Sequence, residues 1–133
     1  MRRLIDTGAV LALMDSHDQH HLAAAAFAYK HANNDWILPE TVFVETMVLI
    51  KARINAQRAI NVGQSLMKSE RFTIVPLDEK YRQETWNIFV RYSDKQWSYV
   101  DCSILALARQ MQIKHVFAFD HHFNQMAELQ REP

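Results

Sequence analysis

VFAFD, residues 116–120, is the stretch that decides the fold: four apolar residues that end in a carboxylate. A short continuous apolar run of this kind is typical of a strand that is buried on both faces of a parallel sheet. Three further runs have the same character and cover Arg3 to Ile5, Trp36 to Leu38 and Arg71 to Val75. Together with Val116 to Phe119, they predict a central parallel sheet of four or five strands.

Longer helical patterns separate the predicted strands, with apolar or alanine positions that recur every three or four residues. The predicted helices cover Leu22 to His31, Thr41 to Arg53, Asn55 to Ser69, Asp78 to Arg91 and Tyr99 to Met111, with shorter ones near Gly8 and from His121 to Glu128. Strands that alternate with helices predict a three-layer α/β/α fold, in which helices cover both faces of the sheet. The 133 residues hold no linker or repeat, so a single domain is expected over residues 1–133.

Composition excludes several classes of protein. Fifteen basic and fifteen acidic side chains cancel, so no global positive field attracts nucleic acid. The two glycines, Gly8 and Gly63, cannot build a Gly-rich dinucleotide loop or a P-loop. No run approaches the roughly 20 apolar residues of a membrane span, and the lone Cys102 suits a reducing compartment. We therefore expect a soluble, cytoplasmic protein with no membrane partner.

Four carboxylates fall where one edge of the predicted sheet would gather them. Asp6 and Asp120 each follow a predicted strand, and the carboxyl ends of parallel strands meet at a single edge. Glu45 interrupts an otherwise apolar helix face, where an uncompensated charge is costly. Asp101 lies in the first turn of the helix that precedes the last strand.

Each acid also has a structural explanation when taken alone. Asp6, Asp101 and Asp120 can cap or begin helices, and an arginine can neutralise Glu45. Their joint occurrence favours a functional site. Because clustered carboxylates repel one another, a divalent ion would stabilise them, and oxygen ligands suit Mg²⁺ or Mn²⁺ better than zinc. The chemistry that follows is attack on a phosphodiester by a water that the ion activates.

Four short motifs that contain these acids resemble the PIN domain family. They are LIDT at 4–7, PETVFVE at 39–45, SYVD at 98–101 and AFDHHF at 118–123. The resemblance covers nearly the whole chain. It implies a metal-dependent endoribonuclease that hydrolyses RNA, with Asp6, Glu45, Asp101 and Asp120 as the catalytic and metal-binding acids.

The resemblance further implies that Thr7 and Ser98 support the acids through hydrogen bonds. Many short members of the family are VapC-type toxins of type II toxin-antitoxin modules, so it also implies a small antitoxin partner and a homodimer. One departure is Ala118, where the family often has Thr or Ser, so a supporting hydrogen bond to Asp120 is expected to be missing. The final edge strand of many relatives is expected to be short or absent.

Other residues allow more than one interpretation. Trp97, Lys95 and His121 border the predicted site and are possible RNA contacts, because aromatic faces and cations bind single-stranded RNA; packing of the loop is the alternative for Trp97. The histidines of residues 17–21 do not have the spacing of a structural zinc site. Cys102 has no histidine to activate it as a nucleophile.

Two further functions remain as alternatives. A catalytically weak PIN-fold interaction module would keep the fold without turnover, and Ala118 motivates this interpretation. A phosphatase of the haloacid-dehalogenase type also carries an aspartate after its first strand, but it needs a second aspartate where this chain has Gly8.

Overall fold

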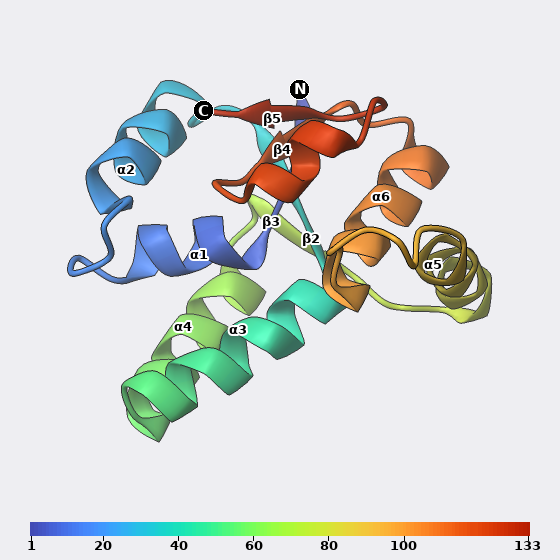
Figure 1. Cartoon of the computed structure of the whole chain (residues 1–133). Coiled ribbons are helices and arrows are strands. Elements are labelled where there is room, and N and C mark those ends of the chain that lie inside the picture. Colours follow the sequence, from blue (N-terminus) through green and yellow to red (C-terminus); the bar gives the residue numbers. More distant parts are fainter.

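A computed structural model describes residues 1–133 and contains one five-stranded sheet (Figure 1). The strands are β1 (Arg2–Ile5), β2 (Asp35–Pro39), β3 (Phe72–Val75), β4 (His115–Phe117) and β5 (Gln130–Glu132). They lie in the order β3-β2-β1-β4-β5, and each neighbouring pair is parallel. The predicted parallel sheet is therefore confirmed, and the edge strand β5 is present but short.

Six α-helices connect the strands. They are α1 (Thr7–Met14), α2 (His21–Lys30), α3 (Glu40–Arg53), α4 (Ala56–Lys68), α5 (Glu79–Arg91) and α6 (Tyr99–Met111). Right-handed crossovers from β1 to β2 to β3 put α1 to α4 on one face of the sheet. The return from β3 to β4 puts α5 and α6 on the other face, and Figure 1 shows these two helices packed together, with strands between them and α1 and α2. This is the predicted three-layer α/β/α arrangement.

The central strands carry the core. Leu4 of β1 lies beside Ile37 of β2 and Val116 of β4 in the sheet register. Leu4, Ile5, Val116 and Phe117 are fully buried, which explains why their stretches of sequence are apolar without alternation. No helix of the structure is both long and apolar enough to span a membrane.

The strand order reverses between β1 and β4. From β1 the chain builds outward through β2 and β3, then returns to the other side of β1 to add β4 and β5. In open α/β sheets, ligands bind in the crevice at such a switch point, outside the carboxyl ends of the strands. The fold therefore directs attention to the residues that follow β1 and β4.

The segment after β4 differs from the expectation. The helix predicted from His121 to Glu128 is instead a short 3₁₀ helix, η1 (His121–Gln125). It ends with the Met126 N–H donating to the Phe123 carbonyl, and the chain then turns at once into β5. The connection between β4 and β5 is therefore a short 3₁₀ segment and a turn rather than a regular α-helix.

Candidate metal centre

Asp6 lies at the end of β1 and is nearly inaccessible, with 6% of the residue exposed. Its backbone N–H donates to the Phe117 carbonyl at 3.0 Å, which extends the β1–β4 pairing up to the acid. The pKa of Asp6 is raised from 3.8 to about 7, mainly by burial and then by the charges of Asp101, Glu45 and Asp120, while a hydrogen bond from the Thr7 amide lowers it. Asp6 is therefore a buried carboxyl surrounded by like charge.

Asp101 is held rigidly at the start of α6 and is 5% exposed. The Asp101 N–H donates to the Ser98 Oγ, and the Ser98 N–H donates to Asp101 Oδ2, both at 3.0 Å. This reciprocal pair is a capping box, and it fixes both the helix start and the carboxylate rotamer. Ser98 therefore does support Asp101 through hydrogen bonds.

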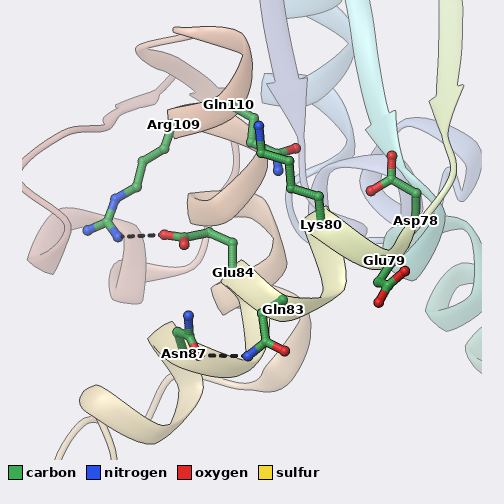
Figure 2. A pocket seen from close by; sticks show the side chains of 8 residues that line it. All are labelled: Asp78, Glu79, Lys80, Gln83, Glu84, Asn87, Arg109 and Gln110. Atoms are coloured by element: carbon green, nitrogen blue, oxygen red, sulfur yellow. Dashed lines mark hydrogen bonds and ion pairs between the residues drawn. The ribbon is translucent and has the colours of Figure 1, made fainter.

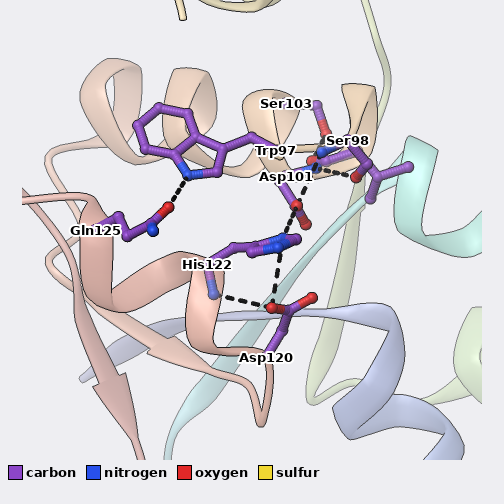
Figure 3. Close-up of polar contacts among 8 residues, drawn as sticks. Trp97, Ser98, Asp101, Ser103, Asp120, His122 and Gln125 are labelled. Atoms are coloured by element: carbon purple, nitrogen blue, oxygen red, sulfur yellow. Dashed lines mark hydrogen bonds and ion pairs between the residues drawn. The ribbon is translucent and has the colours of Figure 1, made fainter. Parts of the chain in front are cut away.

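Asp120 and His122 lie at the start of η1 and bring further ligand atoms close to Asp101. Asp120 caps η1 by accepting the His122 N–H at Oδ1, 2.8 Å away. The His122 ring Nδ1 lies 3.0 Å from Asp101 Oδ2 and 3.4 Å from Asp120 Oδ1 (Figure 3). Ligand atoms of Asp101, Asp120 and His122 all lie within 4.8 Å of one another.

Glu45 is half-buried on α3, and its carboxylate has no hydrogen-bond or ion-pair partner in the protein. Thr41, one turn earlier, shares a 2.6 Å hydrogen bond with Ser103, two residues after Asp101. This bond holds α3 against α6 and so keeps Glu45 on the side of the acids. No arginine neutralises Glu45, which was the structural explanation for this residue. The charge of Glu45 helps to raise the pKa of Asp6.

The hydrogen bond expected from the Thr7 hydroxyl to the acids is not formed: Thr7 Oγ1 is the one buried side-chain polar atom that lacks a partner. A buried hydroxyl without a hydrogen bond is costly and calls for an explanation such as a bound water or ion. Next to Thr7, Asp6 carries a raised pKa, and Asp101 and Asp120 supply further oxygens. This donor set fits a small divalent cation with mainly oxygen ligands.

The three residues predicted as possible RNA contacts differ in their exposure to solvent. The Trp97 residue is only 7% exposed, packs against Tyr92 and donates its indole N–H to Gln125 Oε1 at 2.8 Å (Figure 3). This favours the packing alternative for Trp97. Lys95 and His121 are exposed. Figure 3 shows that His122, the neighbour of His121, is the histidine that points between the two aspartates.

The other reactive side chains are occupied elsewhere. Burial, with the Asp101 charge, raises the pKa of Cys102 to about 11, which disfavours a thiolate. Among the histidines of residues 17–21, the His20 ring stacks on Phe119, and His21 Nδ1 lies 2.7 Å from the Ala12 carbonyl oxygen. Neither Cys102 nor the histidines of residues 17–21 therefore form a second reactive site.

A large cavity lies away from the acids, between the outer faces of α5 and α6, with a volume of about 820 Å³ (Figure 2). All eight residues that line it are polar or charged, and several of them pair with one another or with Glu128. Arg109 pairs with Glu84 and Glu128, and Gln83 donates to Asn87. We interpret it as an open, solvated surface between two helices.

The fold and the site together define an α/β protein with a cluster of carboxylates at the switch point of a parallel sheet. Comparison with protein families identifies it further. The PIN domain model matches residues 3–129, so the chain belongs to the PIN domain family. No curated protein sequence matches it.

Solved structures support the same fold at low sequence identity. VapC20 of Mycobacterium tuberculosis, a toxin that cleaves the sarcin-ricin loop, is 20% identical with a TM-score of 0.87, covering 96% of this chain and 95% of that one. VapBC2 of Rickettsia felis, bound to promoter DNA, is 12% identical with a TM-score of 0.72 and coverage of 99% and 98%. A toxin-antitoxin complex from Klebsiella pneumoniae is 16% identical, with a TM-score of 0.66 and coverage of 96% and 95%.

Proposed function

We propose that this chain, acting as a single PIN-like domain, is a metal-dependent endoribonuclease and the toxin of a toxin-antitoxin pair. The observation that carries the proposal is the raised pKa of buried Asp6. Three other carboxylates from separate elements act on it, and no protein cation neutralises it. Burial, the largest cause of the shift, and this repulsion both disfavour the charged carboxylate, and a bound Mg²⁺ or Mn²⁺ would offset both.

The protein's own groups would perform binding and orientation. Asp6, Asp101 and Asp120 would hold the ion, and Glu45 would add negative charge to the site, since its charge contributes to the raised pKa of Asp6. A bound ion would supply an activated water and stabilise charge on the phosphodiester. The capping box fixes Asp101, and the η1 cap fixes Asp120, so these carboxylates need little reorganisation. No protein nucleophile is required, which agrees with the raised pKa of Cys102.

The test is RNA cleavage by purified protein with Mg²⁺ or Mn²⁺. Asp6→Asn and Asp101→Asn are expected to nearly abolish cleavage, whereas Asp94→Asn, an exposed acid in the loop before α6, should leave it unchanged. A sarcin-ricin loop RNA is the first substrate to assay, because VapC20 cleaves that loop. Unchanged cleavage in both site variants would refute the assignment.

A catalytically weak interaction module is the alternative that Ala118 motivates. Ala118 is fully buried, its N–H donates to the Glu132 carbonyl, and its methyl group offers Asp120 no hydrogen bond. Calorimetry separates the two cases, since a module without turnover should take up neither Mg²⁺ nor Mn²⁺ specifically. The phosphatase alternative loses its basis, because the chain belongs to the PIN domain family and has Gly8 at the required aspartate position.

An antitoxin is the expected protein partner, and the cytoplasm is the expected place of action. The support comes from structural neighbours, among which is a complex of toxin and antitoxin. Co-expression with the product of a small adjacent gene should yield a stable complex in which RNA cleavage is suppressed. Persistence of full activity in such a complex would contradict this part of the proposal.

A homodimer is also proposed, through an apolar face that lies beside the acids. Val100 lines a cavity of about 480 Å³ with Val44 and Val48, and its neighbour Tyr99 packs on Phe89 at 5.5 Å. The face continues to further exposed side chains on α5, Trp86 and Val90. Exposed apolar patches of this kind commonly mark interfaces. Light scattering should report a dimer, and Val48→Glu should convert it to a monomer.

A further inference from the structure

His122 has a position that the four-carboxylate site does not explain. It comes from η1, yet its ring lies between two acids from different elements, at 3.0 Å from Asp101 Oδ2 and 3.4 Å from Asp120 Oδ1. Its side chain is 33% exposed, so solvent reaches the ring without surrounding it. A ring this close to two carboxylates of the proposed site is in position to share their ion.

The separations match those of neighbouring ligands on one ion. In an octahedral site with metal–ligand bonds of about 2.1 Å, adjacent donor atoms lie about 3.0 Å apart. The Nδ1 atom of His122 lies at 3.0 and 3.4 Å from the two aspartate oxygens, close to that spacing, and all three ligand atoms lie within 4.8 Å of one another. Side-chain adjustments alone would therefore bring all three onto one ion.

The scaffold also holds the ring in place. The His122 N–H is bonded to Asp120 Oδ1, and the next residue, Phe123, is fully buried and anchors η1 to the core. Asp101 is fixed independently by Ser98. Preorganised ligands of this kind lose little conformational freedom on binding. Without an ion, the 3.0 Å contact with Asp101 Oδ2 is a hydrogen bond that Nδ1–H donates. An ion would take the place of that proton, and the neutral tautomer with its proton on Nε2 then offers the Nδ1 lone pair to the ion.

We propose that His122 is a nitrogen ligand of the divalent ion at this centre, and that it makes the site prefer Mn²⁺ over Mg²⁺. The inference rests on the proposed function, because it assigns a further ligand to the same ion. Both ions bind carboxylate and water oxygens, but Mn²⁺, as a first-row transition ion, accepts an imidazole nitrogen more readily than Mg²⁺ does. A nitrogen donor therefore shifts selectivity toward manganese.

The test is pulsed electron paramagnetic resonance of the Mn²⁺-loaded protein. Echo modulation from a directly bound ¹⁴N nucleus is expected in the wild type and in His121→Ala, whose exposed ring is the matched control. The modulation should disappear in His122→Ala and in the milder His122→Gln. Calorimetry should show Mn²⁺ affinity falling roughly tenfold in these variants, in the range that loss of a metal-site partner causes, with a smaller change for Mg²⁺.

The outcomes separate this inference from the nuclease proposal. If Mn²⁺ binds and RNA is cleaved but the wild type gives no ¹⁴N modulation, His122 is only a hydrogen-bond partner of the acids, and the inference is wrong. Modulation that persists in both His122 variants would also overturn it. If neither ion binds specifically, both the inference and the proposed function fail. Because the wild-type spectrum alone is decisive, poor folding of a variant does not remove the test.

Discussion

Replacing Asp6 by asparagine should stabilise the metal-free protein while removing its activity. The pKa of Asp6 is raised from 3.8 to about 7, so the folded chain binds this proton more tightly than the unfolded chain does. The free energy of unfolding of the wild type therefore falls as pH rises from about 4 to about 7, and then levels. At 1.36 kcal/mol for each pKa unit, ionisation of Asp6 opposes folding by up to about 4 kcal/mol above pH 7.

The asparagine variant carries no charge at this position and should escape that loss. In the presence of a chelator at pH 8, its melting temperature should exceed that of the wild type by roughly 10 °C, given the usual relation between stability and melting temperature. Near pH 4 the two proteins should melt together. Mn²⁺ should then close most of the gap at pH 8, because an ion at 100 times its Kd stabilises the wild type by about 3 kcal/mol.

The assay is thermal and urea unfolding of both proteins at several pH values, with and without the ion. The exposed Asp94→Asn serves as a control for a general change of net charge, and it should shift stability little at any pH. A variant at Asp6 that is less stable than the wild type at pH 8, or a difference that does not change with pH, would show that desolvation and repulsion do not act at Asp6.

Three further substitutions test the surroundings of the site. Ser98→Ala removes the N-cap of α6 and should cost about 1 kcal/mol in urea unfolding, with a larger relative loss of RNA cleavage than of stability. Trp97→Phe breaks the bond to Gln125 and should lower stability by about 1 kcal/mol while leaving RNA affinity unchanged; a large loss of affinity would restore the RNA-contact interpretation. Tyr81→Phe removes a buried hydroxyl bond to a backbone carbonyl, should cost about 1 kcal/mol, and should delete the one tyrosine that titrates near pH 12 in ultraviolet absorbance.

Most of the fold could be predicted because the decisive signals are local in sequence. Residues 116–119 and 3–5 are apolar without alternation, as buried parallel strands require. The Asn55 and Asp78 caps begin α4 and α5 as expected. The segment from η1 to β5 was harder, because its three-residue strand depends on pairing with β4 rather than on its own sequence, Gln130–Glu132. Tertiary pairing decides that structure.

The site was predictable only in part. Carboxylates that follow strands carry a positional signal, since topology alone brings such strand ends to one edge. Glu45 could be selected for a different reason, because it places a charge within the apolar face of a predicted helix. His122 carried a weaker one, because its adjacency to Asp120 does not say which of two neighbouring histidines turns inward. That choice depends on η1, where the cap on the His122 N–H fixes the ring beside Asp101.

The arrangement of charge at this edge connects stability with ligand binding. Asp6 is buried by the same β1–β4 pairing that forms the centre of the sheet, so the fold cannot relieve its repulsion by moving the side chain into solvent. Repulsion at Asp6 opposes folding when no ion is bound. Because a bound ion removes this repulsion, the same free energy favours binding of the ion. The affinity for a divalent cation should therefore increase as pH rises through the pKa of Asp6. Below that pKa, binding of the cation should release the proton of Asp6.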